Sequence, residues 1–122
     1  MSSDNTQDES HLKANYLASC QRYEDAARYF EDATQSNPDD PVVHNDFGVC
    51  LDAMGEHRRA LEMYQRAIDL DSYYETPFYN MANTYLFLGK HAEALAIMER
   101  ILESRPEDLD IRFERAMILT QM

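Results

Sequence analysis

The chain has 122 residues, 44% of them hydrophobic, which allows one domain or a short array of repeats. It carries 23 acidic and 11 basic side chains, a formal net charge of −12. This balance argues against a nucleic acid or an anionic membrane surface as the main ligand, because both require a cationic face. Gly and Pro are scarce, at 3 and 4 residues, and this favours a mostly helical chain over a turn-rich β fold.

Apolar residues at helical spacing predict seven helices in chain order. The expected ranges are about 8–20, 24–36, 41–54, 58–70, 75–88, 92–104 and 107–120. Residues 1–7 are polar, and we expect a disordered tail there. No apolar run approaches the ~18 residues of a membrane span, and the N-terminus lacks the basic start and apolar stretch of a signal peptide. Since Cys20 and Cys50 form no CxxC pair, we expect reduced thiols and a cytoplasmic location.

The sequence matches itself at an offset of 34 residues without a gap. Small residues recur at one position of the first helix in each copy: Ala14, Gly48, Ala82 and Ala116. Three positions of the second helices also align: Ala26, Ala60 and Ala94; Phe30, Tyr64 and Met98; Ala33, Ala67 and Ile101. We expect neighbouring helices to approach closely at the small residues, with the aromatic side chain of one helix filling the notch left by the other.

The 34-residue period and the G…A-x3-aromatic-x2-A…P spacing resemble the tetratricopeptide repeat. The resemblance implies an all-α fold, a right-handed superhelical stack of antiparallel helix pairs. It also implies a single domain over 8–122, with repeats at about 7–40, 41–74 and 75–108 and a capping helix at about 107–120. The first copy is degenerate, because Ser10 and Lys13 stand where the family places large apolar residues and Gln21 replaces the turn glycine.

The sequence lacks the usual patterns of catalytic and metal sites. His57 and His91 occupy the same repeat position, which favours a structural or surface role. The carboxylates are scattered over helix surfaces, so no paired general acid and base is indicated. We therefore expect no enzyme, no cofactor and no bound metal.

In the geometry of the family, the first helices of the pairs line a concave groove. Asparagine donates and accepts hydrogen bonds at once and so binds an extended backbone, while aromatic residues supply anchoring area. The expected partner-binding residues are Asn15, Asn45, Asp46, Val49, Asp52, Tyr79, Asn80, Asn83, Phe87 and Phe113. They would fit a neutral or basic peptide with apolar anchors. The alternative is that these polar residues only keep the surface soluble.

Repeats of this family that grip the C-terminal carboxylate of chaperones use a Lys-Asn-Asn-Lys-Arg set across three first helices. At the matching positions this chain has His11, Asn15, Asp46, Thr76 and Asn80. Only Asn15 agrees with the set, and Asp46 would repel a carboxylate. We therefore predict no affinity for acidic C-terminal tails.

The leading hypothesis is a protein–protein interaction module: an adaptor, scaffold or assembly factor that holds a peptide or helix of a partner. The alternatives are a small acidic export chaperone of bacterial type III secretion and an oligomerising scaffold or fragment of a longer array. The last helix favours weak homo-oligomerisation, because Phe113, Met117 and Ile118 cannot all pack on the third pair and so leave apolar surface at this edge.

Overall fold

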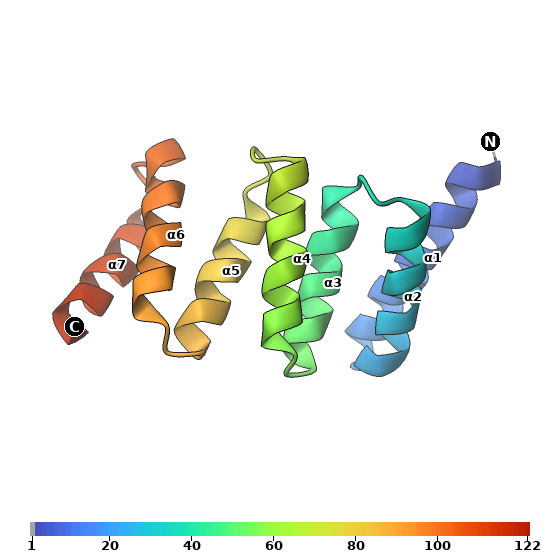
Figure 1. Cartoon of the computed structure of the whole chain (residues 1–122), viewed down its shortest axis with the longest axis horizontal. Helices are drawn as coiled ribbons and strands as arrows, with labels where there is room; N and C mark the ends of the chain where they lie inside the picture. The colour runs from blue at the N-terminus through green and yellow to red at the C-terminus, as the bar shows by residue number, and fades with distance from the viewer. Residues whose placement is uncertain (1) are drawn as a thin grey trace. The chain divides into compact units, whose positions relative to one another are not determined.

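The computed structural model describes the backbone of residues 2–122 and the side chains of residues 9–122. Within 2–122 there are seven α-helices and no strand, which confirms the expected all-α fold (Figure 1). The helices are α1 (Ser2–Ser19), α2 (Tyr23–Ser36), α3 (Pro41–Ala53), α4 (His57–Leu70), α5 (Thr76–Phe87), α6 (His91–Ser104) and α7 (Leu109–Gln121). None of these helices is long and apolar enough to cross a lipid bilayer.

The chain divides into two compact units, Met1–Tyr74 and Glu75–Met122, at a repeat boundary that the sequence predicted. The first unit contains α1 to α4 and the second contains α5 to α7. The single domain and the right-handed stack expected across both units stay predictions. Helix α1 begins at Ser2, earlier than expected. The disordered tail predicted for residues 1–7 stays a prediction, since the side chains of residues 1–8 lie outside the described part.

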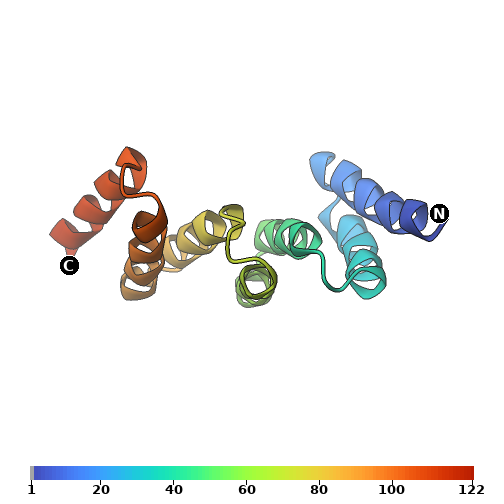
Figure 2. The ribbon, with the colours of Figure 1, turned by 90° about the horizontal axis from the view of Figure 1, so that it is seen from above.

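Each unit is built from helices that pack on their neighbours in sequence. The pairs are α1 with α2 and α3 with α4 in the first unit, and α5 with α6 in the second (Figures 1 and 2). Gly55 and Gly89 turn the second and third pairs with φ angles of +83° and +74°, which glycine adopts without strain. In the first pair Gln21 takes this conformation at φ +64°, in agreement with its position at the turn.

In the α3–α4 pair, an aromatic ring packs directly on a glycine. A Cβ atom on Gly48 would lie 2.5 Å from Cε1 and 2.8 Å from Cδ1 of Tyr64. The Tyr64 side chain is 1% exposed, and its hydroxyl donates to Oδ2 of Asp52 at 2.6 Å. Nδ1 of His57 donates to the other Asp52 oxygen at 2.8 Å. The notch predicted from the repeat is therefore present at Gly48. The Tyr64 side chain fills it and is held there by the hydrogen bond to Asp52.

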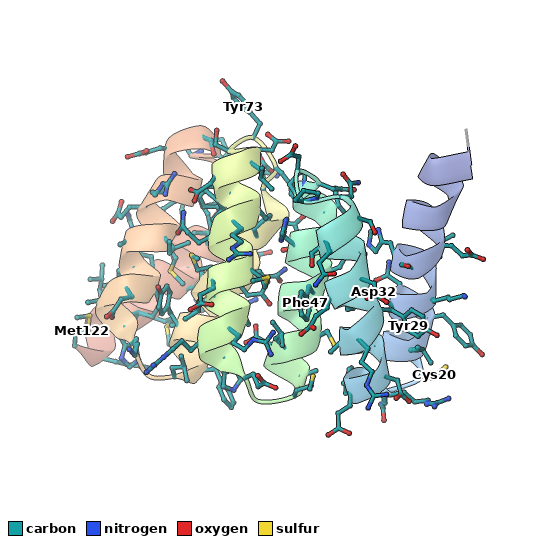
Figure 3. All side chains as sticks on the ribbon, turned by 45° about the vertical axis from the view of Figure 1, so that its right-hand side comes forward. Cys20, Tyr29, Asp32, Phe47, Tyr73 and Met122 are labelled. Atoms are coloured by element: carbon teal, nitrogen blue, oxygen red, sulfur yellow. The ribbon has the colours of Figure 1, made fainter. Side chains whose placement is uncertain are left out.

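Aromatic stacking joins the two pairs of the first unit. The rings of Phe30 on α2 and Phe47 on α3 are stacked, with centroids 5.7 Å apart (Phe47 is labelled in Figure 3). Sγ of Cys50 donates to the carbonyl of Tyr23 at 3.3 Å. Burial raises the pKa of the Cys50 thiol, which keeps it protonated and unreactive. In the second helices of the three pairs, the recurring alanines are fully buried, as predicted: Ala26, Ala60 and Ala94.

Gly48→Ala should lower the free energy of unfolding by about 1–3 kcal/mol. The enclosed Tyr64 ring cannot move away from the added methyl group, because its hydroxyl is bound to Asp52. Urea denaturation followed by circular dichroism measures the loss.

The control combines Gly48→Ala with Tyr64→Met, which reproduces the Ala82 and Met98 of the third pair. We expect this double variant to lose less stability than the sum of the two single variants, because the clash is removed. Strictly additive losses would contradict the clash as the cause.

Candidate partner-binding surfaces

The first unit presents a polar surface along its two first helices, α1 and α3, which contact each other. Nε2 of His11 donates to Oδ2 of Asp46 at 2.8 Å and links the two helices. Asn15 follows His11 by one turn and is exposed, while Val49 follows Asp46 by one turn and is 47% exposed. The structure therefore brings Asn15, Asp46 and Val49 onto one surface, the α1–α3 face.

Two further residues expected on this surface are buried or bonded within the first unit. Asn45 is buried, with 3% of its side chain exposed. Asp52 is half-buried, and its two oxygens accept hydrogen bonds from His57 and Tyr64 of α4. The structure thus uses Asp52 to hold a helix pair together, and neither residue offers a free side chain to a partner.

The second unit presents amides and aromatic rings along α5. Asn80 is half-buried, Asn83 is exposed and Phe87 is 75% exposed, at spacings of three and four residues that place them on one side of the helix. We call these three residues the α5 face. Phe113 on α7 is 66% exposed. The single groove expected from the first helices of both units stays a prediction.

Tyr79 also lies on α5, but its hydroxyl is used inside the unit. It donates to Oδ2 of Asp108 at 2.6 Å, and Oδ1 of Asp108 accepts from the backbone N–H of Ile111 at 3.1 Å, which caps α7. Burial of the phenol and this hydrogen bond raise the pKa of Tyr79 to about 12. The bond from Tyr79 also lowers the pKa of Asp108. Tyr79, expected as a partner contact, therefore ties the start of α7 to α5.

One apolar cavity lies outside the predicted surfaces. It measures about 360 Å³ and is lined by Leu12, Lys13, Tyr16, Leu17 and Tyr29, which we call the N-terminal pocket. Leu12 and Tyr16 are one helical turn apart and are 67% and 68% exposed. Their four-residue spacing on α1 is the sequence signal for this pocket. The signal is weak because Ser10 and Lys13 interrupt the apolar pattern of the first copy.

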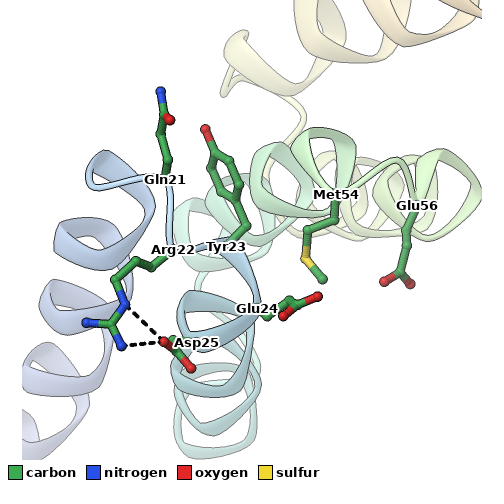
Figure 4. Close-up of a pocket in the computed structure, with 7 residues that line it drawn as sticks. All are labelled: Gln21, Arg22, Tyr23, Glu24, Asp25, Met54 and Glu56. Atoms are coloured by element: carbon green, nitrogen blue, oxygen red, sulfur yellow. Dashed lines mark hydrogen bonds and ion pairs between the residues drawn. The ribbon is translucent and has the colours of Figure 1, made fainter.

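A polar cavity of about 460 Å³ lies where the α1–α2 and α3–α4 turns meet (Figure 4). Figure 4 shows Arg22 turned towards Asp25, and its Nη2 donates to Oδ2 at 2.6 Å. Glu24 and Glu56 line the same cavity. Among the described side chains, no group of three or more His, Cys, Asp or Glu is arranged to hold a metal ion.

Comparison with known proteins identifies the repeat. The family model described as tetratricopeptide repeat matches residues 17–71 and 53–118. The structure of the first TPR of Spaghetti (RPAP3) bound to HSP90 peptide SRMEEVD is similar, with a TM-score of 0.84, 19% identity, and coverage of 94% of this chain and 91% of that one. Hsp70-Hsp90 organizing protein 2 of Arabidopsis thaliana is 24% identical over 88% of this chain and 19% of its own length. Human serine/threonine-protein phosphatase 5 is 26% identical over 84% of this chain and 20% of its own length.

Tyr79→Phe removes the hydrogen bond to Asp108 and should raise the pKa of that carboxyl towards its ordinary value, measured by NMR titration. Because the folded pKa of Asp108 lies below the unfolded one, the bond stabilises the fold above the ordinary pKa, and this contribution is lost as pH falls through the folded pKa. The stability difference between the two proteins should therefore shrink in acid.

Tyr85→Phe is the matched control, since it removes a hydroxyl from the same helix at a half-buried position. It should leave the Asp108 titration unchanged. The assignment fails if Tyr79→Phe leaves the carboxyl titration where it is.

Proposed function

This chain belongs to the tetratricopeptide repeat family, and we propose from this membership that it is a non-catalytic module that binds a peptide or helix of a partner protein. The observation that carries the proposal is the exposure of Phe87 and Phe113, at 75% and 66%, on first helices of the second unit. Exposed Asn83 lies one turn before Phe87. Aromatic anchors beside hydrogen-bonding side chains are typical of protein interfaces.

Similar proteins support a binding role. One similar structure holds a peptide of HSP90, and one relative is named as an organizing protein of two chaperones. The chain spans only about a fifth of the length of the curated relatives compared, so their whole activities, phosphatase included, are not transferred to it.

The charge of the chain favours a neutral or basic partner segment with apolar anchors. The formal net charge is −12, and Asp46 lies half-buried on the α1–α3 face beside the exposed Val49. A cationic segment is drawn towards such a surface and an acidic one is repelled. The amides of Asn15 and Asn83 are exposed on their respective faces and suit the backbone of an extended peptide.

Acidic C-terminal tails are poor candidates, although a structurally similar protein is bound to the HSP90 peptide SRMEEVD. That peptide contains three acidic side chains. In this chain His11 stands where the Lys-Asn-Asn-Lys-Arg set has its first lysine, and the Nε2 of His11 is hydrogen-bonded to Asp46. Asp46 stands where the set has its second asparagine and adds a negative charge.

The cysteines of the chain bear on its cellular location. We propose a cytoplasmic location, supported by two free cysteines, one exposed and one buried.

A second candidate partner is another copy of this chain, favoured by the apolar residues that α7 exposes. The export-chaperone and array-fragment alternatives stay predictions.

Fluorescence anisotropy with labelled SRMEEVD peptide should show no saturable binding to the wild type up to about 100 µM. His11→Lys combined with Asp46→Asn, together with the Asn15 already present, supplies the first three residues of the Lys-Asn-Asn-Lys-Arg set. This double variant should bind the peptide at least about tenfold more tightly, because it removes one negative charge and adds one positive charge. Asp32→Asn combined with Asp69→Asn is the control, since both are exposed acids outside this face. Low-micromolar binding by the wild type would refute the charge argument.

A random peptide library displayed on phage tests the proposal itself. Selection on the immobilised protein should enrich peptides with Lys or Arg and one or two apolar residues. Binding of the selected peptides should be lost with Asn83→Ala combined with Phe87→Ala. It should be kept with Tyr73→Ala, which removes an aromatic ring that is 92% exposed on the α4–α5 connection (Figure 3). Enrichment of acidic peptides, or no enrichment, would contradict the proposed function.

A further inference from the structure

A second cavity of the first unit lies where the end of α2, the start of α3 and the end of α4 come together. It measures about 380 Å³, and we call it the α2–α4 cavity. None of its lining residues belongs to the α1–α3 face or to the α5 face. The lining includes Gln35, Pro38, His44, Arg66, Asp69 and Leu70.

His44 contributes a buried polar atom that has no partner. The residue is 3% exposed, and its Nε2 lies 2.9 Å from the carbonyl oxygen of Pro38. Because a carbonyl oxygen only accepts, Nε2 carries the proton and donates, and in the neutral ring Nδ1 is then an acceptor. This buried Nδ1 makes no hydrogen bond within the described part of the chain. Such an acceptor destabilises a fold unless water or a ligand supplies a donor.

The third copy of the repeat shows that packing does not require a histidine at this position. The residues 34 positions after His44 and Arg66 are Phe78 and Arg100. Phe78 is buried, and Cζ of Arg100 lies 4.9 Å from the centroid of its ring. In the second copy Arg66 is exposed and forms no hydrogen bond or ion pair with any described side chain. The second copy therefore has a polar ring and a free guanidinium where the third has a closed cation–π contact.

The charges around the α2–α4 cavity favour a neutral ligand. Arg66 lies one turn from Glu62 on one side and from Asp69 on the other, and both acids are exposed. Asp69 also lines the cavity, and the whole chain carries a net charge of −12. An anionic ligand would be repelled by these acids, and a cationic ligand would meet Arg66.

We propose that the α2–α4 cavity binds a neutral primary amide carried on an apolar body. A primary amide offers two N–H donors and one carbonyl acceptor, and the cavity offers two acceptors and one cationic donor. One N–H would donate to Nδ1 of His44 and the other to Asp69, while the carbonyl would accept from Arg66. Pro38 and Leu70 supply apolar wall for the rest of the ligand. A glutamine or asparagine side chain and a small aromatic amide share this chemistry.

The amide has to displace a side chain to reach His44, because Nδ1 is closed to bulk water in this structure. Gln35 and Leu70 lie in the last turns of α2 and α4, and both are exposed. Exposed side chains change rotamer on a fast timescale, so these two can move without disturbing the helix pairs.

Titration of the isotopically labelled full chain with benzamide, followed by NMR at about pH 8, tests the proposal, since imidazole is neutral there. The Nδ1 resonance of His44 should move saturably, with a dissociation constant of the order of 1–10 mM for so small a ligand. N,N-dimethylbenzamide has no N–H, and benzoate has a negative charge in its place. Both should bind at least about tenfold more weakly. Acetylglutamine methylamide, compared with benzamide, distinguishes a protein side chain from an aromatic amide as the preferred source.

His44→Phe reproduces the residue of the third copy, so we expect it to fold, and circular dichroism checks this. Benzamide should then no longer shift the backbone amide resonances at the end of α4. Arg66→Met should weaken binding, and Arg58→Met, which removes an exposed arginine of α4 outside the cavity, should leave it unchanged.

Three results would overturn the proposal. The first is an Nδ1 resonance of His44 that stays in place up to about 50 mM benzamide, which would leave water as its partner. The second is equal binding of N,N-dimethylbenzamide, and the third is a His44→Phe variant that binds benzamide like the wild type. Because Asn83 and Phe87 are unchanged in every variant, peptide capture by the α5 face succeeds or fails separately.

Discussion

The contact between the Tyr64 ring and Gly48 shows the constraint on which the rest of the structure depends. With no Cβ on Gly48, α4 approaches α3 until the ring lies against the backbone, and Asp52 holds the Tyr64 hydroxyl there. A packed interior tolerates little change in volume at such a point. A small residue recurs every 34 positions, so the same side of each first helix packs against the second helix of its pair. The opposite side of the first helix faces the solvent or a partner. Asp46 and Val49 lie on the surface because the neighbouring Phe47 and Gly48 of α3 are needed in the interior.

The helix ranges and the buried face of each helix were predictable from the sequence, because both depend on the spacing of apolar residues along the chain. The turns at Gly55 and Gly89, the turn at Gln21 and the buried recurring alanines all follow from that pattern. Asn45 and Asp52 were expected among the partner-binding residues, and the structure buries Asn45 and bonds Asp52 to Tyr64 of α4. Residue type alone does not reveal such a partner in another helix. A signal for Asp52 did exist, since a buried tyrosine hydroxyl usually requires an acceptor and Tyr64 was predicted to be buried. The bond from Tyr79 to Asp108 joins positions 29 residues apart, and the helical period carries no information about it.

The hydrogen bond from His11 to Asp46 bears on the charge that we propose for a partner of this chain. In this chain α1 and α3 contact each other, and positions 11 and 46 lie side by side. A lysine and an asparagine there would present a donor and a cation to a carboxylate. A histidine and an aspartate satisfy each other and leave a negative charge. Two side chains are enough to change the charge at this place, so fold similarity alone does not determine the partner.

The apolar side chains that α1 and α7 expose are explained by the same packing rule that forms the core. A small residue on one helix and a bulky apolar side chain on another constitute a contact that is stable only when both are present. Inside the array each copy supplies what its neighbour requires, as Phe30 does for Phe47. Leu12 and Tyr16 on α1, and Leu109, Phe113 and Met117 on α7, are exposed apolar side chains for which the described part of the chain supplies no such neighbour.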